Sequence, residues 1–159
     1  MTFEEVVRRC AIEQLYTDYV HCLDADELEA WPDFFTEDCR YRITSAENYE
    51  AGLPLGIVYA TSRNMLHDRV TALRQANIYE PQRYRHFVSS LNVADDNGTT
   101  VEAAANIMVV RIMQDGAMSL FAVGRYVDRL VLDGAAWRFA DKTVVLDSRR
   151  IDTLLAIPI

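Results

Sequence analysis

The sequence predicts a single α+β domain in which a strongly curved antiparallel sheet wraps around N-terminal helices and forms a cone. Helical periodicity occurs in the first half of the chain, whereas the second half consists of long strand-like segments separated by turn signals. Helices followed by a meander of strands are typical of α+β proteins and not of βαβ units. The 159 residues, half of them apolar, suffice for one compact core, and we expect one domain over residues 1–159.

The first element is a helix predicted from Thr2 to about Leu23. Thr2 and Glu5 have the spacing of a capping box, in which each side chain accepts a hydrogen bond from a free amide at the helix start. One apolar stripe has the helical period and is expected to pack on the sheet: Ile12, Leu15, Tyr16, Tyr19, Val20 and Leu23. A second stripe lies roughly 160° away and needs other cover, from an irregularity or frayed turns near Cys10 or from a neighbouring subunit. It comprises Phe3, Val6, Val7 and Cys10.

Short elements are predicted between the first helix and the long strands. The first of them is acidic and is expected to break at Trp31, because the residue before a proline disfavours the α conformation. Ser62 has a side chain suited to cap the last of them. The predicted elements are a short helix at 26–35, strands at 39–44 and 57–60, and a helix from 62 to about 77.

Three turn signals of the Asp-Gly or Asn-Gly type divide the second half of the chain into four long segments. Strands of this length exceed the usual 3–10 residues, so the sheet must twist and curl. Gly124 and Gly134 are expected to ease the bend. The predicted strands cover about 84–94, 100–113, 118–132 and 136–146.

Composition and charge exclude several classes of protein. The chain carries 16 Lys and Arg against 24 Asp and Glu, a net charge of −8, which argues against binding to nucleic acid or to an anionic membrane surface. No apolar run is long enough to span a bilayer, and the acidic start is unlike a signal peptide. Cys10, Cys22 and Cys39 are odd in number and widely spaced, which argues against a disulfide framework. We therefore expect a reduced, cytoplasmic protein.

The pattern of possible ligands and nucleophiles predicts no metal site and no cofactor site. The three histidines, His21, His67 and His86, lie far apart and have no partner at metal-ligand spacing. A glycine-rich phosphate loop and a nucleophile elbow are also missing from the sequence.

Asp24 and His86 form the one weak acid–base constellation. If both face a cavity in the cone, they could act as acid and base on a small substrate. The competing interpretation is a structural histidine and a solvated acidic turn. Four tyrosines could line the mouth of such a cone: Tyr16, Tyr19, Tyr41 and Tyr59.

Arginine and tyrosine residues are interleaved around the predicted helix at 62–77 and the strand that follows. This combination is typical of protein–protein hot spots, because both side chains carry apolar area together with a directed hydrogen-bond donor. The alternative is a set of ion pairs within the chain. The candidate interface residues are Arg63, Arg69, Arg74, Tyr79, Arg83, Tyr84 and Arg85, together with Phe3 and Val6 of the second helix stripe.

Several segments, in their order and spacing, carry a family resemblance: 31–42, 52–53, 69–74, 77–80, 83–86, 124–128 and 154–159. Together they resemble the small (beta) subunits of Rieske-type aromatic-ring-hydroxylating dioxygenases over nearly the whole chain. Residues 31–86 are most similar to the branch that acts on carboxylated aromatics such as terephthalate and salicylate.

The resemblance implies a nuclear-transport-factor-like, cystatin-like cone. It also implies that the small subunits associate as a trimer and assemble with large subunits in a three-plus-three hexamer. In that family the Rieske [2Fe-2S] cluster and the mononuclear iron belong to the large subunit, so this chain is expected to be mainly structural and to have no catalytic residue. The same cone also occurs in standalone isomerases and dehydratases, for which Asp24 and His86 are the candidate pair, and in small-molecule-binding proteins.

Overall fold

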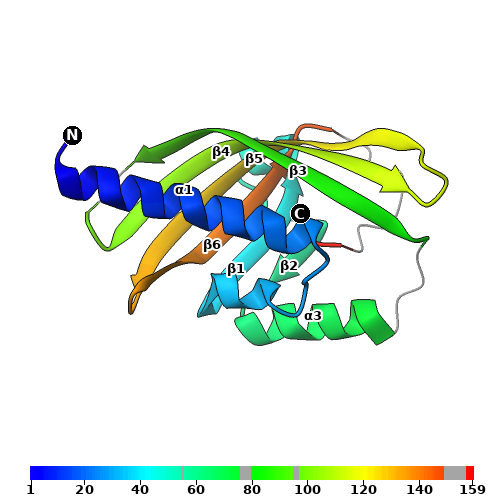
Figure 1. Cartoon of the computed structure of the whole chain (residues 1–159), viewed down its shortest axis with the longest axis horizontal. Helices are drawn as coiled ribbons and strands as arrows, with labels where there is room; N and C mark the ends of the chain where they lie inside the picture. The colour runs from blue at the N-terminus through cyan, green and yellow to red at the C-terminus, as the bar shows by residue number, and fades with distance from the viewer. Residues whose placement is uncertain (55, 76–79, 95–96, 149–156) are drawn as a thin grey trace.

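The computed structural model describes residues 1–54, 56–75, 80–94, 97–148 and 157–159. One long helix crosses the concave face of a curved six-stranded sheet, and shorter helices lie beside it (Figure 1). The order of strands in the sheet is β2-β1-β6-β5-β4-β3. The elements are α1 (Phe3–Asp24), η1 (Trp31–Phe34), β1 (Phe35–Ser45), α2 (Ala46–Glu50), β2 (Val58–Ala60), α3 (Arg63–Gln75), β3 (Gln82–Ala94), β4 (Thr100–Met113), β5 (Met118–Asp133) and β6 (Ala136–Leu146).

Helix α1 has the predicted start and the predicted buried face. The Glu5 amide donates to the Thr2 hydroxyl at 3.2 Å and the Thr2 amide donates to the Glu5 carboxylate at 2.6 Å, which completes the capping box. The stripe from Ile12 to Leu23 is buried except for the half-buried Val20, whereas the second stripe is exposed, with Phe3 at 83%. The two stripes therefore face different surroundings, as the sequence predicted.

The segment after α1 corrects the prediction of a helix at 26–35 that breaks at Trp31. Residues 28–30 form turns, and the 3-10 helix η1 begins at Trp31, with Pro32 in its first positions. Proline is tolerated there because the first amides of a helix have no partner within the helix. Helix α2 was not predicted. Helix α3 buries Leu66, Val70 and Leu73 as expected, and position 77, its predicted end, lies outside the described residues.

The predicted curved, antiparallel sheet is present, and one pair of its strands is parallel. Strands β3 to β6 form the predicted meander, and β1 and β2 are antiparallel, but β1 pairs with β6 in parallel. A parallel pair needs a long crossover connection. Here the crossover contains β2, α3 and the first three strands of the meander.

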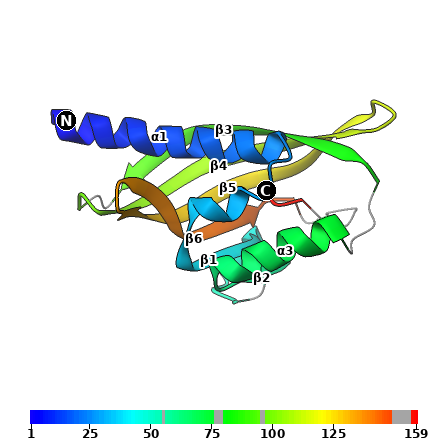
Figure 2. The ribbon, with the colours of Figure 1, turned by 60° about the horizontal axis from the view of Figure 1, so that its bottom comes forward.

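Curvature of the sheet comes from irregular pairing and from Gly124. The register shifts within the pairs β3–β4, β4–β5 and β5–β6, and such bulges bend and twist a strand. A β-carbon built at Gly124 would overlap the Val145 carbonyl oxygen of β6, so only glycine permits the two backbones to approach this closely. The curled sheet encloses α1 and η1 on its concave side, which gives the cone (Figure 2).

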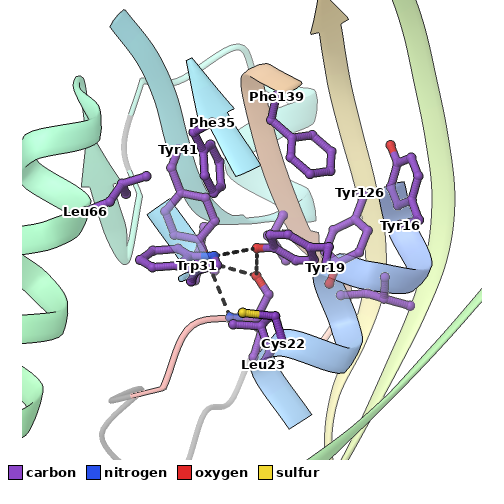
Figure 3. Packing of buried hydrophobic residues seen from close by; sticks show 14 of the residues in the cluster. Tyr16, Tyr19, Cys22, Leu23, Trp31, Phe35, Tyr41, Leu66, Tyr126 and Phe139 are labelled. Atoms are coloured by element: carbon purple, nitrogen blue, oxygen red, sulfur yellow. Dashed lines mark hydrogen bonds between the residues drawn. The ribbon is translucent and has the colours of Figure 1, made fainter. Parts of the chain in front are cut away.

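Aromatic rings fill the interior of the cone (Figure 3). Among the described residues, six of the largest fully buried side chains are aromatic: Tyr19, Trp31, Phe35, Tyr41, Tyr126 and Phe139. The Trp31 indole donates to the Tyr19 hydroxyl at 3.1 Å, and the Tyr41 hydroxyl donates to the main-chain oxygen of Ile159 at 2.8 Å. The last residues of the chain therefore occupy the space between these rings.

The expectation that four tyrosines line a mouth of the cone is wrong. Tyr16, Tyr19 and Tyr41 belong to the packed core, whereas Tyr59 is exposed on β2, at the edge of the sheet. Edge-to-face contacts, such as that between Trp31 and Tyr41 at 5.2 Å between centroids, hold these rings in fixed orientations.

Candidate functional site

The structure brings Asp24 and His86, the pair singled out from the sequence, into direct contact. Asp24 is the last residue of α1 and His86 lies on β3. The imidazole Nδ1 is 2.6 Å from one carboxylate oxygen of Asp24, and the His86 backbone amide donates to the other at 3.1 Å. This geometry places a proton on Nδ1. The pair therefore ties the end of α1 to the sheet.

Burial limits what the Asp24–His86 pair can do. The side chain of His86 is fully buried and that of Asp24 is 8% exposed. A cavity of about 590 Å³ lies beside Asp24 and is also lined by Arg83 and Tyr84. The His86 Nε2 atom is buried and has no hydrogen-bond partner among the described residues. A general base must come within hydrogen-bond reach of its substrate, and in this conformation Nε2 is closed off.

A second polar cluster, which the sequence analysis missed, lies inside the aromatic core. The Lys142 ammonium donates to Asp128 at 2.9 Å, and the Tyr16 hydroxyl donates to the same carboxylate oxygen at 2.5 Å. The Lys142 nitrogen also lies 3.4 Å from the centroid of the Tyr126 ring, a cation–π contact. Both charged side chains are completely buried.

Burial dominates the electrostatics of this cluster. Loss of water lowers the pKa of Lys142 to about 8, although Asp128 favours its charged form. Burial also raises the pKa of Asp128, against the opposing influence of Lys142 and Tyr16. The sequence did contain a signal that Lys142 is buried. Alternate residues of a strand point to the same face, and Lys142 therefore shares its face of β6 with the buried residues Val144 and Leu146.

Three of the candidate interface arginines have interactions within the chain: Arg63, Arg69 and Arg74. Arg63 donates through Nε to the Phe35 carbonyl oxygen at 2.9 Å. Arg74 forms ion pairs with Asp26 at 2.9 Å and Glu29 at 2.8 Å. This pairing lowers the pKa of the Glu29 carboxyl through the hydrogen bond from Arg74. For Arg74 the structure matches the alternative of ion pairs within the chain.

The remaining candidate interface residues divide between the interior and the surface. Tyr84 is buried on the concave face of β3, 5.0 Å from Phe121 between ring centroids. Arg69 is half-buried on α3, and Tyr79 lies outside the described residues. Exposed candidates remain at both ends of the molecule: Phe3, Val6, Arg83 and Arg85.

Within the described parts of the chain, no three His, Cys, Asp or Glu side chains come together as a metal site would require. None of the described helices is both long and apolar enough to cross a bilayer. All three cysteines are free, and burial raises the pKa of Cys22 and of Cys39 to about 11, which keeps both as neutral thiols.

The cone, its filled interior and the order of its strands are the features of this chain that can be compared with known protein families. Residues 19–153 match the family model described as ring hydroxylating beta subunit. The chain belongs to this family and is therefore a subunit of a ring-hydroxylating dioxygenase. This confirms the resemblance found in the sequence.

Individual relatives cover almost the whole chain. The chain is 43% identical to terephthalate 1,2-dioxygenase, terminal oxygenase component subunit beta 1, of Comamonas sp, over 89% of this chain and 92% of that protein. It is 42% identical to the anthranilate 1,2-dioxygenase small subunit of Burkholderia cepacia, over 93% and 92% of the two chains. A crystal structure of a beta subunit assigned to an aromatic-ring-hydroxylating dioxygenase of Novosphingobium aromaticivorans superposes with a TM-score of 0.89 and 39% identity, over 98% of this chain and 99% of that one.

Proposed function

We propose that this chain is the structural, non-catalytic small subunit of a Rieske non-heme-iron dioxygenase that hydroxylates a carboxylated aromatic ring. The observation that carries the proposal is the packed interior of the cone. A standalone pocket enzyme needs an open cavity that its acid and base can reach. Here aromatic side chains and Ile159 fill the interior. Asp24 lines a cavity of about 590 Å³, but among the described residues His86 does not line it, and the His86 Nε2 atom is buried. Family membership together with a filled cone favours assembly over independent catalysis.

The iron chemistry belongs to the large subunit in this proposal. The partner holds the [2Fe-2S] cluster and the mononuclear iron, and this chain supplies no ligand to either. The scattered positions of potential metal ligands among the described residues are compatible with that division. We place the complex in the cytoplasm, because all three cysteines are free thiols.

The proposed assembly contains three large and three small subunits, with contacts between the small subunits. Exposed apolar residues on α1 support such contacts, because monomeric proteins rarely expose contiguous patches of this kind. The proposed substrate class rests on the relatives, whose names refer to terephthalate and to anthranilate. Both molecules are aromatic rings that bear a carboxylate.

The test is production of this chain with and without a large subunit of the same dioxygenase family. We expect the chain alone to hold no stoichiometric iron and to show no oxygenase activity. Together with the large subunit and a reductase, it should form a coloured complex that oxidises terephthalate or anthranilate. Elemental analysis that finds one tightly held iron per lone chain would refute the structural role.

The same experiment separates the proposal from the acid–base alternative. Asp24→Asn removes the carboxylate that holds His86, and Glu80→Gln is a control at an exposed acidic position of the same region. If the pair were catalytic in the complex, Asp24→Asn would lower kcat of intact complexes by orders of magnitude. We expect assembled Asp24→Asn complexes to turn over at the rate of the control.

A further inference from the structure

Apolar side chains form aligned rows on the convex face of β3, β4 and β5. Residues paired across neighbouring strands point to the same face of a sheet. The register aligns Phe87 with Met108 and Met108 with Val123. In the next row, Val110 pairs with Leu120. We call this surface the sheet patch, and it consists of Phe87, Met108, Val110, Met118, Leu120 and Val123.

The sheet patch is exposed and ends abruptly. Met118 is 74% exposed and Leu120 is 61% exposed, although both are apolar. The adjacent row on the same face is polar, since Ser89 pairs with Asn106 and Asn106 with Arg125. The apolar rows lie toward the end where the β4–β5 hairpin projects beyond α1 (Figures 1 and 2). A contiguous apolar surface confined to a projecting end marks a docking site.

The charges around the sheet patch define the partner that fits it. Arg83 and Arg85 are exposed on β3, at the margin of the patch, where Arg85 pairs with Val110. Neither the two apolar rows nor the adjacent polar row of this face contains an Asp or Glu residue. Two sheet patches facing each other would thus bring unpaired arginines together. The fitting partner is an apolar surface that carries carboxylates.

A surface with these properties lies at the other end of the same chain. The first turns of α1 and the β5–β6 turn form an apolar groove of about 340 Å³, which we call the helix groove. Its apolar lining is Phe3, Val7, Ala11, Leu132 and Trp137. Glu4 lines the groove, and Glu5 lies in the same helical turn. Arg8 also lines it, and that side chain already has an interaction within the chain.

We propose that the sheet patch of one copy of this chain docks on the helix groove of the next copy. The start of α1 and the tip of the β4–β5 hairpin lie at opposite ends of the long axis, so the contact is head to tail (Figure 1). Arg83 and Arg85 of one copy then approach Glu4 and Glu5 of the next. A head-to-tail contact generates a ring when its rotation closes. The inference rests on the proposed function for the association of small subunits and for the number of copies in the ring, and it adds the two surfaces that make the contact.

Two variants, one in each surface, test the contact. Leu120→Asp places a carboxylate in the sheet patch, and Val7→Lys places a cation in the helix groove. Both positions are exposed, so the fold should remain intact, as circular dichroism and urea denaturation will show. We expect each variant alone to weaken self-association at least tenfold by analytical ultracentrifugation. Ile57→Asp is the matched control, because Ile57 is 57% exposed and lies outside both surfaces.

Mixing the two variants is the decisive measurement. Each keeps the surface that the other has lost, so one intact contact is possible between them. The mixture should contain a species of twice the 18.2 kDa chain mass that neither variant forms alone. Absence of this species, or a wild-type chain that stays monomeric at micromolar concentration, overturns the proposal.

Co-purification with the large subunit separates this inference from the proposed function. If the wild-type chain is monomeric and Leu120→Asp abolishes capture by the large subunit, the sheet patch binds that subunit. That outcome refutes the head-to-tail contact and leaves the proposed function standing. If instead the mixture forms the expected species but no large subunit is captured, the contact holds and the proposed function fails.

Discussion

Lys142 and Asp128 place two opposite charges inside an aromatic core, where their mutual attraction must offset the loss of hydration. A buried ion pair is weak evidence for net stability, because desolvation of both groups can exceed the Coulombic gain. Breaking such a pair is different, since it leaves one charge buried and uncompensated. Tyr16 adds a hydrogen bond to the carboxylate, and the Tyr126 ring lies against the ammonium.

These contacts predict that the single and the double variant behave differently. Lys142→Met should destabilise the chain by about 3–5 kcal/mol at neutral pH, because Asp128 loses its cation. Lys142→Met combined with Asp128→Asn keeps an acceptor for Tyr16 and should restore stability to within about 1 kcal/mol of the wild type. Urea denaturation measures both. Equal losses in the two variants would show that the charge on Asp128 is not the cause.

The pH dependence of folding stability in the wild type follows from the lowered pKa of Lys142. The pKa is about 8 when folded and 10.5 in the ordinary group, so below pH 8 Lys142 is charged in both states and its burial opposes folding. Between about pH 8 and 10.5 the unfolded chain binds more protons, so this contribution to stability rises with pH. The neutral double variant lacks that contribution. The stability of the wild type relative to the double variant should therefore increase as pH rises from 8 to 10.

The sequence could identify Asp24 and His86 as candidates but could not show that they touch. They lie 62 positions apart, and their contact depends on where α1 crosses β3. Lys142 was overlooked although strand parity placed it inward, because a charged residue in a strand is ordinarily assigned to the solvent face. For single residues, the local sequence pattern therefore predicts which face a side chain occupies, whereas its interaction partners depend on the tertiary structure.

At the scale of elements, every long hydrophobic period gave a correct prediction, whereas short segments gave mixed results: the strand at 57–60 is present as β2, but α2 and η1 were not predicted as they occur. Helix α1 and the four strands of the meander span 11 residues or more, so each contains several repeats of its pattern. Helix α2 and η1 have five and four residues, too few for a period. The parallel pairing of β1 with β6 depends on where the chain returns after a long crossover, which no local pattern encodes.

Gly124 offers a test of how the sheet bends. Gly124→Ala should cost about 3 kcal/mol, because the new methyl group would force β5 away from the Val145 carbonyl of β6. Gly52→Ala is the control. Its added carbon meets open space, and only its φ of 69° is unfavourable, so about 1 kcal/mol is expected. Urea midpoints compare the two, and similar losses would mean that Gly124 acts through backbone conformation and not through close packing.

At the scale of the whole molecule, the interior is filled with buried aromatic side chains, whereas the exterior exposes apolar side chains that are suited to contact other subunits. Aromatic packing fills the cone, and the His86 Nε2 atom is buried without a hydrogen-bond partner among the described residues. The exterior exposes Phe3 at the start of α1 and Leu120 near the start of β5. The start of α1 and the β4–β5 hairpin lie at opposite ends of the long axis (Figure 1). A net charge of −8 keeps identical chains apart at long range, so a local basic margin has a large effect on how partners approach.

Arg85 and Arg74 therefore make a matched pair for the last prediction. Arg74 is paired with Asp26 and Glu29 of its own chain at the surface, so Arg74→Ala should change stability by less than about 1 kcal/mol and leave assembly intact. Arg85 is exposed at the margin of the sheet patch, so Arg85→Ala should slow assembly at low salt. Screening shortens the reach of charges to about 8 Å at physiological ionic strength, so the difference between wild type and Arg85→Ala should shrink as salt rises. Stopped-flow light scattering of assembly measures both rates. Identical rates for the two variants at every salt concentration would remove Arg85 from the interface.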